Sequence, residues 1–258
     1  MHTSPSAAEF RLGDSGHPER WFAFSAVLLS FPVLMSVPLW HSRLPATGDR
    51  FVARWMNSPR IGILLARLEL DQFWAKPGLR SVAALGGPSV LIVVMASIMA
   101  LGWWRRDKLL TLLALVGPVV AGALTEWVGK PLVDRRIDGV HPTFPSGHVT
   151  TAAAIAALLF VATRRTATTK RRHILTMVVW VIPAAVAVSV LRLGWHVATD
   201  ALAGIGVGAG VVFGTLGALT VAANAIAGAG TASHESACAD EGLMQPADRP
   251  GPPSTAAT

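Results

Sequence analysis

Long uncharged runs constrain the fold of this chain more than any other feature of its sequence. The first run, residues 21–40, is about 20 residues long, which is enough to cross a bilayer as a helix, and a tryptophan stands at each end. Charged residues make up only 14% of the 258 residues and hydrophobic residues 52%, whereas a soluble domain has about 25% charged residues. The sequence therefore predicts an integral membrane protein.

Five further runs have the length and composition of membrane helices. They cover about residues 81–104, 109–128, the stretch from just after 148 to 163, 174–191 and 201–226. The last run is rich in glycine and alanine, which allow close packing of helices. We therefore expect six membrane spans.

Residues 41–80 are too charged to cross a membrane, but they contain an amphipathic pattern. Ser58-Pro59 is a typical helix start, and Ile61, Leu64, Leu65 and Leu68 follow at helical spacing. This pattern favours a helix that lies on the membrane surface. The predicted fold class is therefore all-α: a polytopic membrane protein with six transmembrane helices in a bundle and an interfacial amphipathic helix between spans one and two.

The two ends of the chain differ from its apolar centre. Residues 1–20 are polar, with mixed charge and no signal-peptide pattern, so we expect a short cytoplasmic tail. Residues 229–258 are small, polar and proline-rich, which predicts a disordered tail and a membrane domain over residues 21–228. Cys238 is the single cysteine in the sequence, which excludes an internal disulfide and a cysteine-built metal site.

Basic residues cluster in two short loops, at 105–108 and 164–172, that fall on the same side of a six-span protein. The positive-inside rule places this side, and both termini, in the cytoplasm of a multi-pass plasma-membrane protein. Basic residues in 41–80 argue the other way, but long loops weigh less in this rule. The net charge of +7 is attributed to such loops rather than to nucleic-acid binding. The loops at 129–147 and 192–200 then share the extracytoplasmic face.

The first of these outer loops leads into the turn Pro145-Ser146-Gly147-His148. A Ser-Gly pair at the mouth of a helix leaves backbone N–H groups unpaired, and the helix dipole favours an anion there. Gly147 lets the anion approach closely, and His148 adds a group that can carry a proton near neutral pH. The alternative is an ordinary helix start followed by an interfacial histidine.

The second outer loop contains His196 and Asp200, which are four residues apart, about one helical turn. Asp200 can therefore accept a hydrogen bond from one ring nitrogen and make the other a better nucleophile. His148 could protonate a leaving group, while Lys130 and the nearby arginines would hold phosphoryl charge. The alternatives are a capping aspartate, an i,i+4 pair of Lys130 with Glu126, and lipid-facing arginines.

Together these residues resemble the three-part signature of the phosphatidic acid phosphatase type 2 superfamily, metal-independent lipid phosphatases related to vanadium haloperoxidases and bacterial acid phosphatases. The matching segments are Lys130-Pro131-Leu132-Val133-Asp134-Arg135-Arg136, Pro145-Ser146-Gly147-His148, and Gly194-Trp195-His196 through Asp200 to Gly204. They lie between residues 130 and 204, and the six-span plan extends the resemblance over about residues 21–226.

The resemblance implies a role for each matching residue. His196 would attack phosphorus and form a phosphohistidine, Asp200 would orient it, and His148 would protonate the departing oxygen. Lys130, Arg135 and the Ser146-Gly147 turn would bind the phosphate oxygens, and water would then release inorganic phosphate. No metal ion and no cofactor is implied.

Two departures from the family pattern concern its arginines. The first motif is a lysine, six residues and Arg-Pro, but Ile137-Asp138 stands here in place of Arg-Pro, which leaves Arg135 and Arg136 as the available cations. The third motif has Ser-Arg, then five residues and then the histidine, and Val190 holds the arginine position here. Arg192 could substitute for it. Loss of such a contact without replacement would lower the rate roughly 10²-fold or more.

We therefore expect a membrane phosphatase that acts on a lipid-linked phosphate monoester or diphosphate, such as phosphatidic acid, phosphatidylglycerol phosphate or a polyprenyl diphosphate. The expected partners are this lipid substrate and the bilayer, and the sequence leaves the oligomeric state open. One alternative is a phosphotransferase of the same superfamily. The other is a catalytically silent lipid-binding or transport protein, which is favoured if Ile137 and Val190 leave the phosphate site without its arginines.

Overall fold

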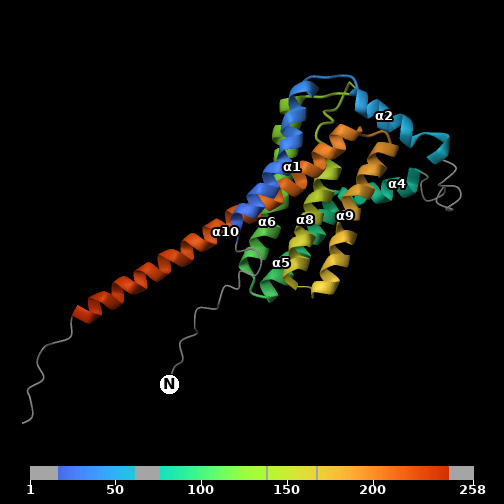
Figure 1. Ribbon diagram of the computed structural model, residues 1–258. Helices are drawn as coiled ribbons and strands as arrows, with labels where there is room; N and C mark the ends of the chain where they lie inside the picture. Colours follow the sequence, from blue (N-terminus) through green and yellow to red (C-terminus); the bar gives the residue numbers. More distant parts are fainter. Residues whose placement is uncertain (1–16, 62–75, 138, 167, 244–258) are drawn as a thin grey trace, which may run out of the picture. The chain divides into compact units, whose positions relative to one another are not determined.

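The computed structural model describes residues 17–61, 76–137, 139–166 and 168–243 (Figure 1). All the regular structure in these ranges is helical, as predicted. Most of the expected amino-terminal tail, Leu64 to Leu68 of the expected surface helix, and Asp138 lie outside the described residues. The chain divides into two compact units, of which the first ends at Thr220 and contains every predicted site residue.

The described residues contain five helices that are long and apolar enough to cross a membrane. They are built on α1 (Pro18–Leu39), α6 (Lys108–Ala123), α8 (Gly147–Thr166), α9 (Thr169–Arg192) and α10 (Ala198–Leu243). A sixth span is obtained if α4 (Lys76–Ala83), η1 (Ala84–Gly86) and α5 (Pro88–Trp104) count as one. The predicted class of a polytopic helical membrane protein is confirmed.

The second predicted span is bent rather than one straight helix. Its two parts meet at 43° on either side of Gly87. Gly87 has an extended conformation (φ −82°, ψ 162°) because the residue before a proline is disfavoured in a helix, and Pro88 then begins α5.

A ten-residue helix, α2 (Thr47–Met56), precedes the surface helix that the sequence predicts. Asp49 and Met56 on one face of α2 are buried, whereas Phe51 and Trp55 are exposed. The chain becomes helical again at residue 59, directly after Ser58, where the predicted surface helix begins. The segment between spans one and two therefore contains an amphipathic helix that the apolar pattern after Ser58 did not reveal.

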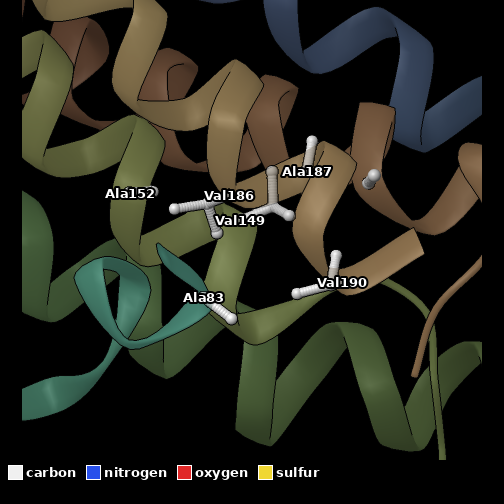
Figure 2. Close-up of a cluster of buried hydrophobic side chains, with 7 residues drawn as sticks. Ala83, Val149, Ala152, Val186, Ala187 and Val190 are labelled. Carbon is white, nitrogen blue, oxygen red and sulfur yellow. The ribbon is translucent and has the colours of Figure 1, made fainter. Parts of the chain in front are cut away.

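Helix α8 lies at the centre of the first unit and packs against α5, α6 and α9 (Figure 1). A cluster of small buried side chains joins it to its neighbours, including Ala83 of α4, Val149 of α8 and Val190 of α9 (Figure 2). The start of α10 also packs on α8: a Cβ atom added to Gly208 would lie 2.2 Å from the Thr150 carbonyl oxygen. Glycine at this position therefore permits direct contact between the two helix backbones.

The third predicted span continues beyond its expected end at residue 128. After α6 the chain forms a π-helical turn, η2 (Leu124–Gly129), and then α7 (Lys130–Val133). Asp134 ends this helix in the left-handed conformation (φ 42°). The wider turn carries Glu126 and leads into Lys130.

Helix α10 extends into the carboxyl-terminal segment, residues 229–258, for which the sequence predicts disorder. Its backbone is helical to Leu243, and residues 244–258 lie outside the described residues. Several alanines occur between 229 and 243, and the next proline is at position 246. Alanine has the highest helix propensity of all residues, so composition alone underestimates the helix here.

Candidate active site

A cavity of about 790 Å³ opens where the two predicted outer loops meet. The first loop contributes residues from Ile137 to His148 and the second contributes Gly194 to Val197. The expectation that both loops share one face therefore agrees with the structure. The polar and charged side chains at this cavity are those of Thr125, Glu126, Lys130, His141, Thr143, His148, Thr150, Thr151 and His196.

His196 lies in the loop between α9 and α10, and Asp200 lies in the first turn of α10. The His196 Nδ1 atom is 3.6 Å from Asp200 Oδ2, which is longer than a hydrogen bond. Asp200 is fully buried and the His196 side chain is 12% exposed. Since Nδ1 faces the carboxylate, Nε2 is the ring nitrogen that is available to a ligand in the cavity. A contraction of about 0.5 Å would complete the hydrogen bond, and catalytic contacts often tighten in this way when substrate binds.

The turn at Ser146 begins α8 and links it to α10. The Ser146 N–H donates to the Asp200 carbonyl oxygen at 3.0 Å, and the Ser146 carbonyl accepts from the Thr150 hydroxyl at 2.9 Å. The Ser146 hydroxyl is buried and does not line the cavity, whereas Gly147 and His148 do. The main chain of Ser146 therefore holds His148 on the same cavity as His196. The His148 ring also lies 5.6 Å from the Trp195 ring, centroid to centroid.

Lys130 lines the cavity and forms an ion pair with Glu126. Its Nζ atom donates to both carboxylate oxygens, at 2.6 and 2.7 Å. The same carboxylate lies against the start of α8, because a Cβ atom on Gly147 would be 2.7 Å from Glu126 Oε1. A phosphate oxygen that binds Lys130 must therefore compete with the Glu126 carboxylate.

Replacing Glu126 with glutamine (Glu126→Gln) is expected to strengthen phosphate binding, because it removes the competing charge from Lys130. Loss of a partly exposed ion pair corresponds to about 1 kcal/mol, or roughly a fivefold lower inhibition constant for inorganic phosphate. The constant is measured from phosphate-release rates at several phosphate concentrations. Glu126→Asp keeps the negative charge and is the matched control. Weaker inhibition in the glutamine variant would show that the carboxylate assists binding instead.

Arg135, for which the sequence predicts a contact with phosphate, does not line the cavity. The side chain is fully buried and donates to Asp200 Oδ1 at 2.7 Å and to Asp49 Oδ2 at 2.8 Å. It also donates to the Thr199 hydroxyl at 2.6 Å. Burial alone would raise the pKa of Asp49, but the hydrogen bonds from Arg135 and Thr199 outweigh it and hold this pKa below its ordinary value. Asp49 therefore remains charged at neutral pH.

The other two predicted phosphate-binding arginines are also engaged elsewhere. Arg136 donates to Asp134 Oδ1 at 2.7 Å and to the Val140 carbonyl at 3.1 Å. Arg192 donates to the Met56 carbonyl at 2.6 Å, at the end of α2. Within the described part of the chain, no arginine lines the cavity.

The two positions where the family pattern has arginine differ in their surroundings. Ile137 lines the cavity, so its side chain occupies part of the wall that a phosphate would contact. Val190 is fully buried in the apolar cluster of α4, α8 and α9 (Figure 2). An arginine at position 190 would have to enter this cluster, because Val190 packs among its small side chains.

Asp49 and Thr199 contact Arg135 behind the cavity, and the sequence did not indicate either of them. Thr199 N–H donates to Asp49 Oδ1 at 2.8 Å, which joins α2 to the first turn of α10. The local signal at Asp49 is that of a helix cap, since its carboxylate also accepts from the Ala46 N–H at 3.0 Å. Nothing local indicates that the carboxylate reaches Arg135, 86 residues away.

Comparison with known proteins agrees with the helical membrane fold. The family model described as the PAP2 superfamily matches residues 123–223, which include every predicted site residue. Comparison with curated proteins gave no significant match. The crystal structure of the first transmembrane PAP2 type phosphatidylglycerolphosphate phosphatase from Bacillus subtilis is similar in fold, with a TM-score of 0.52 and 20% sequence identity. The match covers 77% of this chain and 93% of that one.

The fold is therefore that of a helical membrane protein similar to a transmembrane PAP2 type phosphatase. Residues 123–223 form a PAP2-superfamily region, and the resemblance seen in the three motifs is confirmed.

Proposed function

We propose that the chain hydrolyses a lipid-linked phosphate monoester or diphosphate through a phosphohistidine formed on His196. The observation that supports this most is the composition of the cavity. His196 with Asp200 behind it, His148 from another helix, and Lys130 all meet there, although they come from three separate parts of the sequence. A nucleophile, an acid and a cation around one chamber are the groups that phosphoryl transfer needs.

In the proposed reaction, Nε2 of His196 attacks phosphorus while the bond from phosphorus to the leaving oxygen breaks. His148 donates a proton to that oxygen, and Asp200 stabilises the positive charge on the His196 ring. Lys130 and the unpaired N–H groups at the start of α8 bind the remaining phosphate oxygens. His148 then takes a proton from water, which attacks the phosphohistidine and releases inorganic phosphate.

A lipid substrate is supported by the position of the cavity at the ends of membrane helices. It lies beyond α6 and at the start of α8, while the basic loops lie at the opposite end, where Arg165 pairs with Asp107. By the positive-inside rule, we infer an extracytoplasmic cavity in the plasma membrane and cytoplasmic termini. The candidate substrates are phosphatidic acid, phosphatidylglycerol phosphate and polyprenyl diphosphate.

The proposal is tested by incubating the purified protein in detergent, with EDTA, with each of these three lipids and measuring inorganic phosphate. We expect phosphate release from at least one lipid, without added metal. A requirement for added Mg²⁺ would overturn the metal-independent mechanism. Absence of phosphate release from all three lipids, with or without Mg²⁺, would overturn the proposed hydrolysis of these substrates.

A catalytically silent lipid-binding protein is the second candidate, and the arrangement of the arginines favours it. Ile137 and Val190 replace the family arginines, while Arg135 and Arg192 contact Asp49 and the Met56 carbonyl rather than the cavity. The same lipids distinguish the two functions. Binding to immobilised protein without turnover supports the silent function, whereas turnover supports the phosphatase.

A further inference from the structure

Helix α2 contacts the segments that carry the candidate active site at both of its ends, through an ion pair and a hydrogen bond. Near its amino end, Asp49 binds Arg135 at 2.8 Å, and at its carboxyl end the Met56 carbonyl accepts from Arg192 at 2.6 Å. Both arginines were expected to bind phosphate. They instead connect α2 to the loop before α8 and to the carboxyl end of α9, so the position of α2 is coupled to that of the cavity.

Asp49 makes the most extensive of these contacts. Its Oδ1 atom accepts from the Thr199 N–H at 2.8 Å, and its Oδ2 atom accepts from Arg135 and from the Thr199 hydroxyl, the latter at 3.0 Å. The Asp49 carboxylate is fully buried, like the Arg135 side chain and the Asp200 carboxylate. Asp49, which lies in α2, thus caps the first turn of α10. The residue that it holds, Thr199, directly precedes Asp200.

The two oxygens of the Asp200 carboxylate have different neighbours because Arg135 binds only one of them. It holds Oδ1 at 2.7 Å, which leaves Oδ2 directed toward the Val197 N–H at 3.4 Å and His196 Nδ1 at 3.6 Å. Without Asp49, the full charge of Arg135 would act on Asp200 and weaken its attraction for the His196 ring. With Asp49, the three buried groups carry a net charge of about −1.

We propose that Asp49 is a positioning residue for the His196–Asp200 pair and acts on it through Arg135. Asp49 fixes the orientation of Asp200 and supplies the negative charge that balances Arg135. This inference rests on the proposed function, because it concerns the nucleophile of that reaction.

The proposal predicts a pH effect in Asp49→Asn, which removes one negative charge behind His196. The attacking form of His196 is the unprotonated ring, and a less negative environment disfavours its protonation. The acidic limb of the pH profile of kcat/KM should therefore move to lower pH, by on the order of 1 unit. The other charged and titratable groups at the cavity, Glu126, Lys130, His141 and His148, are unchanged in this variant.

The proposal also predicts a lower kcat. Since Asp200 is less well held, kcat should fall about tenfold, while KM for the lipid should stay within about twofold, because Asp49 does not line the cavity. Both parameters are obtained from phosphate release by full-length protein in detergent, with thermal unfolding measured in parallel.

The matched control is Asp134→Asn. It removes the carboxylate that pairs with Arg136, the residue next to Arg135. Asp134 accepts from Arg136 at 2.7 Å and lies outside the cavity, so the acidic limb should not move. Asp49→Glu keeps the charge and should also leave the limb in place. An unshifted limb in folded, active Asp49→Asn would overturn the proposal.

If Asp49→Asn does not fold, the positioning role is tested with Thr199→Val instead. This variant removes the hydroxyl that contacts both Arg135 and Asp49 but keeps all charges. We expect kcat to fall about tenfold with the limb unshifted, and an unchanged kcat would overturn the positioning role. Failure of this inference is distinguishable from failure of the proposed function, because the latter would leave the unsubstituted protein without phosphate release.

Discussion

Replacing His196 with alanine (His196→Ala) is expected to lower kcat for phosphate release by at least about 10³-fold, because the reaction loses its proposed nucleophile. His196 lines the cavity, and its Nδ1 atom faces Asp200, so Nε2 is the atom available to phosphorus. The loss should appear in kcat rather than in KM, since Lys130 and the start of α8 remain to bind the phosphate. Initial rates of phosphate release from the best lipid of the panel give both constants.

The matched control is another histidine outside the cavity, changed in the same way. His41 is 65% exposed, and its Nδ1 atom lies 3.5 Å from Asp134 Oδ2, away from the cavity-lining residues. His41→Ala should keep the activity of the unsubstituted protein. Retention of more than about a tenth of the activity in His196→Ala would be incompatible with a nucleophilic role for this histidine.

The second large effect is expected on stability rather than on substrate binding. Arg135→Ala leaves Asp49 and Asp200 fully buried without the cation between them. Breaking a buried ion pair in this way costs about 3–5 kcal/mol. The midpoint of thermal unfolding in detergent should fall on the order of 10 °C, and phosphate release should fall with it.

Arg136→Ala provides the comparison, because Arg136 is the adjacent residue and also pairs with an aspartate. Its side chain is 42% exposed, so loss of the pair should cost less than about 1 kcal/mol. A phosphate ligand at position 135 would behave differently: its loss would weaken inhibition by inorganic phosphate and leave the unfolding midpoint unchanged. That result would support the original prediction for Arg135 over the buried network.

The sequence predicted the membrane helices well because their signal is local. An uncharged run such as 174–191 identifies a membrane helix without reference to any other part of the chain. The shared face of the two outer loops also followed from the number of spans between them. The bend at Gly87 and the helix from 229 to 243 were missed, because a single Gly-Pro step and an alanine-rich polar stretch are each compatible with more than one structure.

The candidate site was predicted less well, because a charged side chain can satisfy its charge in several ways. Arg135 could bind a phosphate or two carboxylates, and its choice depends on Asp49, 86 residues earlier in the chain. Arg192 similarly contacts a carbonyl 136 residues away. The histidines were easier to place, since His196 and Asp200 are one turn apart and His148 follows a recognisable turn.

The central claim is that His196 becomes phosphorylated during turnover. It is tested most directly by mixing the purified protein, in EDTA, with a lipid whose phosphate is radiolabelled, quenching the reaction rapidly under alkaline conditions and mapping the labelled peptide. We expect an alkali-stable phosphoryl group on the peptide that contains His196, and none in His196→Ala. Label on a different residue, or rapid phosphate release by the His196→Ala protein, would contradict the claim.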